Sequence, residues 1–499
     1  MAALINETSL IIWDESPMND RRCFETLDRT LRDVLDEPNR IFGGKSVMLG
    51  GDFRQTLPVK KAATRDETIQ SSVAKSYLWP HFKVHYLTEN MRLNNENLSD
   101  VDRQRMSSFA QWLLDIGNGQ IGTPDDSDPE NTSWIDIPDE YCIPNDDQGI
   151  AQLIKFIYDD DTLQHPSAAK LQDKAIICPK NDMVDTINAK ILSLLSTTTR
   201  VYISHDDAVP HGHDGGEVEL LYPKEYLNTL TFAGLPPHRL ELKIGTPVML
   251  LRNINIAGGL CNGTRLIVTQ LLPKVIEARI ITGTRVSQKV FLPRIPLTTR
   301  DPRTPFVFKR KQFPVKICYA MTINKAQGQS LKKIGVYLSE PVFSHGQLYV
   351  ALSRATTPDG LKILIDSQHT KSPTATKNIV YKSFLLELDS QQVNFVLYAL
   401  IVNFLPNYYV PYRTMAATGD PNRMAEAKGK MIAIEQDVTT VANLRPTHYN
   451  RTIECYVVSK DGSNINKSLS ISSATSRSSM PNQVSRSKAV AVNFNSRIP

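Results

Sequence analysis

Short apolar runs separated by polar, Arg-rich stretches fill roughly the first 95 residues. Leu-Ile-Ile-Trp at 10–13 and Val-Met-Leu at 47–49 have the length and composition of buried strands. The segment SSFAQWLLDIGNG at 107–119 repeats apolar residues at helical spacing and ends in Gly, which predicts a helix that stops there. Residues 174–178 predict another strand, followed by a turn and a helix through Asn188. Such alternation of strands and helices is typical of an α/β protein.

The pattern changes between 241 and 310, where short β-rich runs are broken by Gly, Asn and Pro. Runs of this kind predict a small β-barrel, and the α/β pattern returns at 315–366. Residues 125–147 carry nine Asp or Glu and no Lys or Arg, so we expect a solvated surface connection there. The Ser-rich, basic segment from about 460 has few large apolar residues, which predicts disorder.

At 499 residues the chain has room for two to four domains. Hydrophobic residues make up 41% and charged residues 22%, as in ordinary globular proteins. A net charge of +5 and a pI near 8.7 favour polyanionic partners only weakly at this size. Six cysteines show no C-x-x-C spacing, which favours a reducing compartment over a zinc module. No signal peptide is visible, and the apolar segment 393–405 is too short to span a bilayer, so we expect a soluble intracellular protein.

The stretch FGGKSVMLGGDFRQTLPV contains Gly44-Lys45-Ser46, which match the end of the phosphate-loop pattern G-x-x-x-x-G-K-[ST]. The first position of that pattern falls on Asn39 instead of Gly. A phosphate loop also opens a helix whose N-terminus faces the phosphates, whereas here a strand-like run follows the Lys. We therefore interpret the Gly-Gly pair as a turn into a strand.

Two carboxylates follow the first predicted strand in the sequence LIIWDESPM. Asp14 and Glu15 would lie at the carboxyl edge of a parallel sheet, where ligands bind. The first can hold Mg²⁺ through its water shell, and the second can orient or deprotonate an attacking water. The second predicted strand is followed by Asp52, Arg54 and Gln55, and a Gln beside a γ-phosphate can sense it by hydrogen bonding. Taken alone, each signal is weak, and an ordinary turn at a strand end is the commoner explanation of an Asp-Glu pair.

Two arginines, Arg92 in LTENMRL and Arg354 in QLYVALSRAT, could stabilise charge on a transferring phosphoryl group, although a lone Arg is usually a surface residue.

The order of these segments along the chain is more informative than any one of them. CYAMTINKAQGQSL at 318–331 and VFSHGQLYVALSRAT at 342–356 follow the earlier ones as expected of a helicase motor. The chain closely resembles the Pif (petite-integration-frequency) helicases, above all their plant-type and Helitron-encoded members. The resemblance covers about residues 5–385 and implies a superfamily-one, ATP-dependent DNA helicase that moves 5′ to 3′.

The resemblance also implies a role for each matched residue. Asp14 and Glu15 are similar to the family's magnesium-holding and water-activating carboxylates, and Gln55 to its γ-phosphate sensor. Gln327 and Gly328 in NKAQGQS resemble the motif that links the ATP cleft to DNA. Two arginines would reach the nucleotide phosphates from the second motor domain, namely Arg92 and Arg354. The residues expected near single-stranded DNA are Arg252, Asn262 and Arg265 in the inserted barrel, and Thr322 and Lys325 in CYAMTINKAQGQSL.

The implied fold is α/β, with two RecA-like motor domains of the P-loop NTPase type, the first incomplete, an inserted small β-barrel and a partly disordered C-terminal tail. The expected boundaries are 1–95 for the partial first motor domain, 96–165 for a helical and acidic connection, 166–240 and 311–385 for the two parts of the second motor domain, 241–310 for the barrel and 386–499 for an extension. The resemblance gives the extension no place in the motor. One segment of it, VTTVANLRPTHYNRTIECYVVSKD, loosely resembles the first strands of an OB-fold, with a chance strand pattern or a gene-model error as the alternatives.

The sequence departs from the family in one important respect, because it contains no G-x-x-x-x-G-K-[ST] pattern. In the family that loop precedes the Asp-Glu strand, and the nine residues before Leu10 leave no room for it. Without the Lys and the backbone N–H groups of the loop, we expect this chain to bind ATP poorly and hydrolyse it very slowly. The replacement of a common Ser by Ala326 is expected to be mild.

The family implies ATP and Mg²⁺ as cofactors, single-stranded and forked DNA as partners, and work in DNA repair, recombination and telomere maintenance. We expect a monomer in the nucleus, with the mitochondrion as the alternative, and no membrane association. The competing hypothesis is a catalytically inactive remnant, Helitron-derived, that only binds single-stranded nucleic acid.

Two further patterns have ordinary explanations. His211-Gly212-His213-Asp214 is interpreted as a surface turn, and Asn450-Arg451-Thr452 as a glycosylation sequence without meaning in a reducing compartment.

Overall fold

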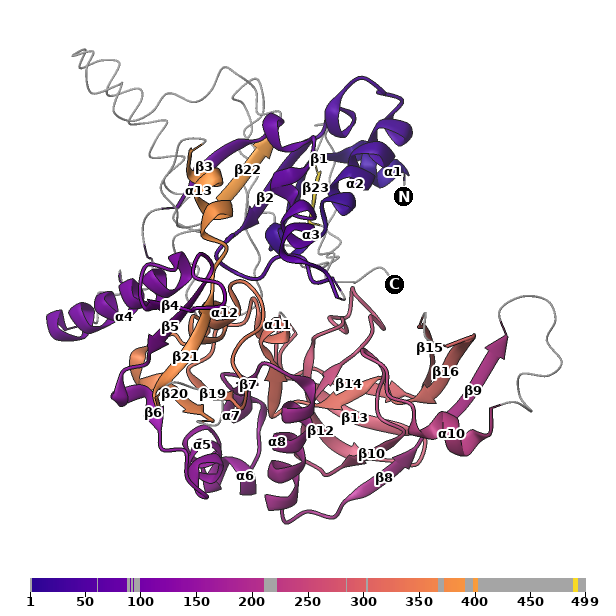
Figure 1. Cartoon of the computed structure of the whole chain (residues 1–499). Coiled ribbons are helices and arrows are strands. Elements are labelled where there is room, and N and C mark those ends of the chain that lie inside the picture. The colour runs from indigo at the N-terminus through magenta and orange to yellow at the C-terminus, as the bar shows by residue number, and fades with distance from the viewer. Residues whose placement is uncertain are drawn as a thin grey trace, which may run out of the picture. The chain divides into compact units, whose positions relative to one another are not determined.

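The computed structural model of the chain describes residues 2–60, 62–87, 90, 93, 99–210, 222–283, 285–301, 304–366, 372–390, 398–402 and 488–491. The chain divides into two compact units. The first unit consists of Met1–Phe53, Leu57–Asn90 and Leu386–Asn493, and the second of Arg54–Thr56, Met91–Leu385 and Phe494–Pro499. Each unit is built on a sheet that carries helices (Figure 1).

The first unit holds a five-stranded sheet in the order β23-β1-β2-β22-β3. The predicted strands at 10–13 and 47–49 are confirmed as β1 and β2, which pair in parallel from Leu10↔Ser46 to Trp13↔Leu49. β22 runs antiparallel to both β2 and β3, whereas β23 runs parallel to β1. β22 and β23 both come from the 386–499 extension, so the structure gives these two segments a place in the sheet of the first unit. The strands are β1 (Thr8–Trp13), β2 (Ser46–Gly51), β3 (Lys83–Tyr86), β22 (Tyr398–Val402) and β23 (Lys488–Ala491).

The main helix of the first unit is α2, which packs its apolar side on the sheet. Phe24 and Leu31 on α2 are buried, and the Phe24 ring lies 4.5 Å from that of Trp13, centroid to centroid. Asp20 caps α2 by accepting a hydrogen bond from the backbone of Arg22, which satisfies one of the free N–H groups at the helix start. The helices and 3₁₀ turns of this unit are α1 (Ala2–Glu7), η1 (Ser16–Met18), α2 (Arg21–Leu35), η2 (Ile41–Gly44), α3 (Arg65–Gln70), η3 (Val73–Lys75) and η4 (Trp79–His81).

The second unit holds a parallel sheet in the order β18-β7-β19-β20-β6. β7 confirms the strand predicted at 174–178, and its residues alternate between two cores. Ala175 and Ile177 face a core shared with α4 and α12, whereas Ile176 and Cys178 face one shared with α5 and α8. Helices on both faces are typical of parallel sheets. The strands are β6 (Cys142–Ile143), β7 (Lys174–Cys178), β18 (Ala320–Thr322), β19 (Lys333–Leu338) and β20 (Leu361–Ile365).

The helix predicted at 107–119 is confirmed, but it begins earlier. Ser99 accepts a hydrogen bond from the backbone of Asp102 and so starts α4 at Asp100, and Gly119 (φ 67°) ends it. The helices of the second unit are α4 (Asp100–Asn118), α5 (Gly149–Ile157), α6 (Asp160–Gln164), α7 (Ala168–Leu171), α8 (Asn181–Leu194), α10 (Lys224–Thr229), α11 (Ile323–Ala326) and α12 (Gln347–Leu352), with the 3₁₀ turns η6 (Asp139–Tyr141) and η7 (Pro358–Gly360). The chain passes from the second unit to the first within α13 (Lys382–Ser390), after Leu385.

Antiparallel strands between Arg200 and Ile317 form an insertion in the second unit, with a larger sheet in the order β14-β13-β12-β11-β17. Its edge strands in the described part of the chain are β14 and β17, so the small closed barrel expected from the sequence is not confirmed. Strands before 241 and after 310 also take part, because β9 pairs with β16 and β11 with β17. The strands are β8 (Arg200–Ile203), β9 (His205–Pro210), β10 (Arg239–Leu242), β11 (Pro247–Leu250), β12 (Arg265–Leu271), β13 (Val275–Ile280), β14 (Lys289–Pro293), β15 (Ile295–Arg300), β16 (Phe306–Gln312) and β17 (Val315–Ile317).

The acidic stretch at 125–147 is more ordered than the solvated connection expected from its composition. It contributes β5 (Thr132–Asp136), which pairs with β4 (Thr123–Pro124) and with β21 (Ala375–Ile379). The carboxylate of Asp125 is buried and accepts hydrogen bonds from the Trp134 indole and from the hydroxyl and backbone of Ser127. These donors hold the pKa of Asp125 far below its usual range. Composition could not predict the buried Asp125, because its hydrogen-bond donors come together only in the folded chain.

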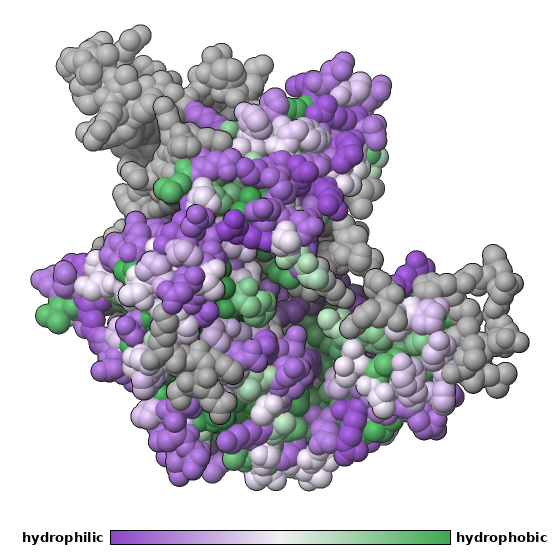
Figure 2. Space-filling view, in the orientation of Figure 1, coloured by the Kyte–Doolittle hydropathy of each residue, from purple (hydrophilic) through white to green (hydrophobic). Residues whose placement is uncertain are grey.

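The surface has an ordinary mixed character. Hydrophilic residues cover most of the visible face, and apolar residues are scattered among them (Figure 2). Among the described residues, no helix has the length and apolar character needed to cross a membrane.

Candidate nucleotide and nucleic-acid sites

The Gly-Gly-Lys segment (43–45) is a turn that packs against α2. Phe42, Gly43 and Gly44 all have positive φ, and a Cβ on Gly43 would lie 2.7 Å from the carbonyl oxygen of Leu31. The glycines therefore allow close approach to α2. Lys45 donates to the backbone oxygen of Asn6 at 3.0 Å, and β2 follows it directly. The interpretation of this segment as a turn into a strand is confirmed.

A buried carboxylate on α2 fixes the same turn. One oxygen of Asp28 accepts from the backbone N–H of Phe42 at 2.5 Å and from Arg32 Nε at 3.0 Å. The other oxygen accepts from the Tyr77 hydroxyl at 2.8 Å and pairs with Arg32 Nη2 at 2.9 Å. Burial and the Asp28 carboxylate together raise the pKa of Tyr77 to about 12. The sequence analysis missed Asp28, which looks like any other acid on an amphipathic helix.

The carboxyl ends of β1 and β2 place acidic groups at one edge of the first sheet. Asp14 and Glu15 follow β1, and Asp52, which is buried, follows β2. Glu15 has left-handed backbone angles (φ 53°, ψ 40°), and its backbone N–H donates to Asp14 Oδ1 at 2.9 Å. A non-glycine residue in this conformation is strained, and such strain is found at functional sites. The predicted pair of carboxylates therefore stands on a tight turn at the expected edge of the sheet.

Gly51 allows this turn to pack against the end of β2. A Cβ at Gly51 would lie 2.1 Å from Pro17 Cδ, which no side chain tolerates. In the part of the chain that the structure describes, no three His, Cys, Asp or Glu side chains are placed to hold a metal ion together. A magnesium ion here would therefore need further ligands from water and from the nucleotide.

The three residues after Phe53 belong by their contacts to the second unit. Arg54, Gln55 and Thr56 are all buried, at 1%, 8% and 2% exposure. The Arg54 guanidinium lies over the ring of Tyr349 in α12, 5.6 Å from its centroid. At Gly346, which precedes α12, a Cβ would lie 2.3 Å from the Arg54 carbonyl oxygen. The start of α12 thus packs directly on the backbone that carries Gln55.

Gln55 and Thr56 also hydrogen-bond to the NKAQGQS segment. The Thr56 hydroxyl donates to Gln327 Oε1 at 2.6 Å, and Gln327 Nε2 donates to Gln55 Oε1 at 3.1 Å. Gln327 is the residue that ends α11, and Gly328 follows it with φ 79°. The structure therefore brings together two residues that the sequence predicted separately, Gln55 and Gln327, and adds Thr56, which the sequence analysis did not single out.

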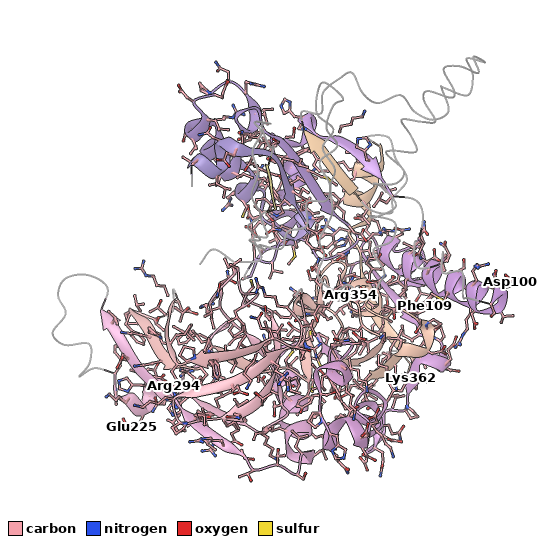
Figure 3. All side chains as sticks on the ribbon, turned by 180° about the vertical axis from the view of Figure 1, so that it is seen from behind. Asp100, Phe109, Glu225, Arg294, Arg354 and Lys362 are labelled. Atoms are coloured by element: carbon pink, nitrogen blue, oxygen red, sulfur yellow. The ribbon has the colours of Figure 1, made fainter. Side chains whose placement is uncertain are left out.

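Arg354 lies just after α12 (Figure 3). Its guanidinium is buried and donates to the carbonyl oxygens of Val350 at 3.0 Å and Gln329 at 3.3 Å, and to Ser353 Oγ at 3.1 Å. These bonds fix the end of α12 and its position on the NKAQGQS segment. A phosphate contact by Arg354 stays a prediction, and Arg92 lies outside the described residues.

Another connection that the sequence analysis missed involves the residue before Gly346. His345 is buried, and its Nδ1 accepts a hydrogen bond from the backbone N–H of Tyr381 at 3.0 Å, while the two rings stack with centroids 4.9 Å apart. The only signal in the sequence was the placement of His-Gly immediately before an apolar helix.

Some of the residues predicted to contact DNA lie together in the second unit. Lys325 Nζ, on α11, donates to Asn262 Oδ1 at 3.2 Å, and Asn262 in turn donates its backbone N–H to Asn253 Oδ1 at 2.7 Å. Thr322 stands at the start of α11, and the half-buried Arg252 precedes Asn253 in the same insertion loop. The α11 segment and the insertion loop thus share one polar surface.

Arg265 corrects the prediction of a phosphate contact. It is fully buried, and its guanidinium donates to the carbonyl oxygens of Leu171, Gln172 and Lys174. These bonds tie β12 to the segment that leads into β7, so Arg265 holds the insertion to the parallel sheet and does not reach DNA. The patterns His211-Gly212-His213-Asp214 and Asn450-Arg451-Thr452 lie outside the described residues, as does the predicted disordered tail, apart from β23.

Comparison with known proteins agrees with these motifs. The family description "PIF1-like helicase" matches residues 1–127, and "DNA helicase Pif1, 2B domain" matches residues 225–271. The zebrafish (Danio rerio) ATP-dependent DNA helicase PIF1 is 27% identical over 367 residues, which is 71% of this chain and 46% of the zebrafish protein. The Campylobacter jejuni ATP-dependent DNA helicase Pif1 is 25% identical over 404 residues, covering 79% of this chain and 76% of the relative.

Solved structures support the fold. A Bacteroides Pif1 helicase in complex with ADP-AlF3 and single-stranded DNA has a TM-score of 0.51 and 21% identity, covering 78% of this chain and 76% of that one. This likeness confirms the mixed α/β architecture with two RecA-like domains. The motifs at the strand ends, their order along the chain and the two family matches lead to one conclusion: the chain belongs to the Pif1-like helicase family.

Proposed function

We propose that this chain is the motor part of an ATP-dependent DNA helicase that moves 5′ to 3′ on single-stranded DNA. One observation carries the proposal: the hydrogen bonds that join Gln55 and Thr56 to Gln327. They connect the predicted γ-phosphate sensor to α11, and Lys325 on α11 bonds to the insertion loop. A motor needs such a physical link between the residue that senses the nucleotide and the surface that holds the track.

The donors at the end of β1 fit a magnesium ion. Asp14 and Glu15 offer oxygen atoms, the ligands that Mg²⁺ prefers, on a turn whose shape is set by Gly51 and Pro17. Asp14 would hold the ion through water, and Glu15 would orient the attacking water and take its proton. A bound Mg²⁺ would neutralise charge on the phosphates. Gln55 would donate to the terminal phosphate, and Arg92 and Arg354 would stabilise the charge that develops there.

The polar surface of α11 and the insertion loop would hold the DNA strand. Lys325 and Arg252 supply positive charge, and Asn262 and Thr322 supply hydrogen-bonding groups for phosphates and sugars. Single-stranded and forked DNA are the proposed substrates. The cellular roles that follow are repair, recombination and telomere maintenance in the nucleus, or in the mitochondrion as the alternative, by a monomer.

A second function is favoured by a specific observation, which is that the 499 residues contain no G-x-x-x-x-G-K-[ST] pattern. That loop supplies most of the contacts to the β- and γ-phosphates in this class of enzyme. The alternative is therefore a Helitron-derived chain that binds single-stranded nucleic acid without hydrolysing ATP. The residues proposed to hold DNA, among them Lys325 and Asn262, are held by contacts that involve neither Asp14 nor Glu15, so DNA binding of this kind would not need a hydrolysed nucleotide.

The deciding experiment is ATP hydrolysis by the purified chain with single-stranded DNA, alongside Glu15→Gln. DNA-stimulated turnover that disappears in Glu15→Gln supports the helicase. Salt-sensitive DNA binding without any turnover supports the binding protein. Turnover that Glu15→Gln retains would refute the assignment of Glu15.

A further inference from the structure

The hydrogen bonds around Gln327 have a direction, because an amide side chain has one accepting and one donating end. The contact between Thr56 Oγ1 and Gln327 Oε1 measures 2.6 Å, and that between Gln327 Nε2 and Gln55 Oε1 measures 3.1 Å. The shorter distance falls in the range of O–H···O bonds and the longer one in the range of N–H···O bonds. The oxygen of Gln327 therefore faces Thr56, and its nitrogen faces Gln55.

This orientation decides which end of Gln55 is engaged. Since Gln55 Oε1 accepts from Gln327, the amide nitrogen of Gln55 is the end that is left to donate to an anion. If Gln327 turned its amide around, its oxygen would instead accept from the Gln55 nitrogen. Gln55 would then offer an oxygen lone pair, which repels phosphate. A Thr hydroxyl can donate or accept, so the separation decides between the two orientations. At 2.6 Å the contact suits an O–H···O bond, whereas a turned amide would place the Gln327 nitrogen closer to the hydroxyl oxygen than an N–H···O bond allows.

The surroundings of Thr56 hold its hydroxyl in place. Thr56 is 2% exposed, so water does not compete freely for it. The main chain that carries Gln55 is held by Gly346, whose missing Cβ leaves room for the Arg54 carbonyl, and by the Arg54–Tyr349 contact. A hydrogen bond between groups fixed in this way is worth more than the same bond at a mobile surface.

We propose that Thr56 is a positioning residue that aligns the amides of Gln327 and Gln55 so that Gln55 presents its N–H donor to the terminal phosphate of the nucleotide. This inference rests on the proposed function, because it assumes that Gln55 meets a nucleotide. It adds a residue outside the predicted set and assigns it a specific task, which is to set the direction of two amides. Thr56 itself touches neither the nucleotide nor the DNA.

The test compares Thr56→Val with Thr56→Ser in the full chain. Val has nearly the shape of Thr but no hydroxyl, whereas Ser keeps the hydroxyl and loses only a methyl group. The affinities for ADP and for ADP with aluminium fluoride, which takes the place of the terminal phosphoryl group, are measured by competition with a fluorescent nucleotide. Affinity for a fluorescein-labelled oligothymidylate without nucleotide is measured by anisotropy as a check on folding and on the DNA surface.

Thr56→Val should weaken binding of ADP–aluminium fluoride about fivefold, the effect of one neutral hydrogen bond, and leave ADP and DNA affinities within about twofold of wild type. Thr56→Ser should restore the wild-type value for ADP–aluminium fluoride. An equal loss for ADP and ADP–aluminium fluoride would show a merely structural role and overturn the proposal, as would a Thr56→Val chain that binds both like wild type. A wild-type chain that binds neither nucleotide would overturn the proposed helicase function together with this inference, and so the two failures can be told apart.

Discussion

Removal of the Asp28 carboxylate should destabilise the first unit. Asp28 is fully buried and accepts from the backbone of Phe42, from the Tyr77 hydroxyl and from Arg32. Asp28→Ala would leave the N–H of Phe42 buried without a partner and would also release the turn from which β2 begins. This substitution therefore tests whether the Gly-Gly-Lys segment is a structural turn.

The size of the effect follows from how much of this network water can reach. Breaking a buried charge pair by removing one partner costs about 3–5 kcal/mol. Tyr77 is 50% exposed and the Arg32 side chain 23% exposed, so water can replace part of what they lose. The orphaned Phe42 N–H contributes about 1–3 kcal/mol, because it stays buried. We expect a loss near the lower end of the range, about 3 kcal/mol.

Hydrogen exchange followed by mass spectrometry measures this loss locally. Peptides that cover β1 and β2 should exchange about a hundredfold faster in Asp28→Ala, while peptides of the second-unit parallel sheet stay unchanged and serve as an internal reference. Asp33→Ala is the matched control, because Asp33 lies on the same helix and is exposed. The reasoning is refuted if Asp28→Ala and Asp33→Ala exchange alike in β1 and β2.

Three further outcomes are expected. Arg265→Met should lower the stability of the second unit by about 3 kcal/mol, as seen in urea unfolding, because buried carbonyls lose their donors, but the salt dependence of DNA binding should not change. Lys325→Ala should weaken binding of single-stranded DNA and reduce the slope of log K against log salt by about 0.7, and an unchanged slope would exclude a phosphate contact. The pKa of Tyr77 is raised to about 12 in the folded chain, so its contribution to stability is complete below about pH 10 and is lost as the pH rises towards 12. A pH titration of wild type against Tyr77→Phe measures that loss, and parallel curves would contradict it.

The sequence was sufficient for those parts of the fold in which the local pattern has one explanation. β1, β2 and β7 are apolar runs bounded by polar residues, and Gly119 ends α4 because glycine adopts the required positive φ without strain. The first and last strands of the antiparallel insertion could not be predicted in this way. Its pairing joins β9 to β16 across about a hundred residues, and no local pattern records which distant strands meet.

Candidate site residues could be named from the sequence only where their chemistry stands in a motif. Asp14, Glu15, Gln55 and Gln327 could be named because long motifs carry them. Arg265 was misassigned, since an Arg in a Gly-rich β segment suits a phosphate contact equally well. What decides its role is the set of carbonyl oxygens at 171–174 that face it in the fold, more than ninety residues earlier in the chain.

Thr56 shows why a motif can be recognised from the sequence although some of its important contacts cannot. Its partner Gln327 lies 271 residues away in sequence, and both bonds of Gln327 depend on which end of the amide faces which neighbour. The same close packing requires Gly346, because any side chain there would collide with the carbonyl oxygen of Arg54. The glycine before α12 and the hydroxyl after Gln55 both contact the short segment that carries Gln55. We expect Gly346→Ala to weaken binding of ADP–aluminium fluoride as Thr56→Val does. Gly346→Ala would shift the backbone that carries Gln55, and Thr56→Val would release the Gln327 amide that orients it. Retention of wild-type affinity in Gly346→Ala would show that the backbone at Arg54 can shift without disturbing the amides.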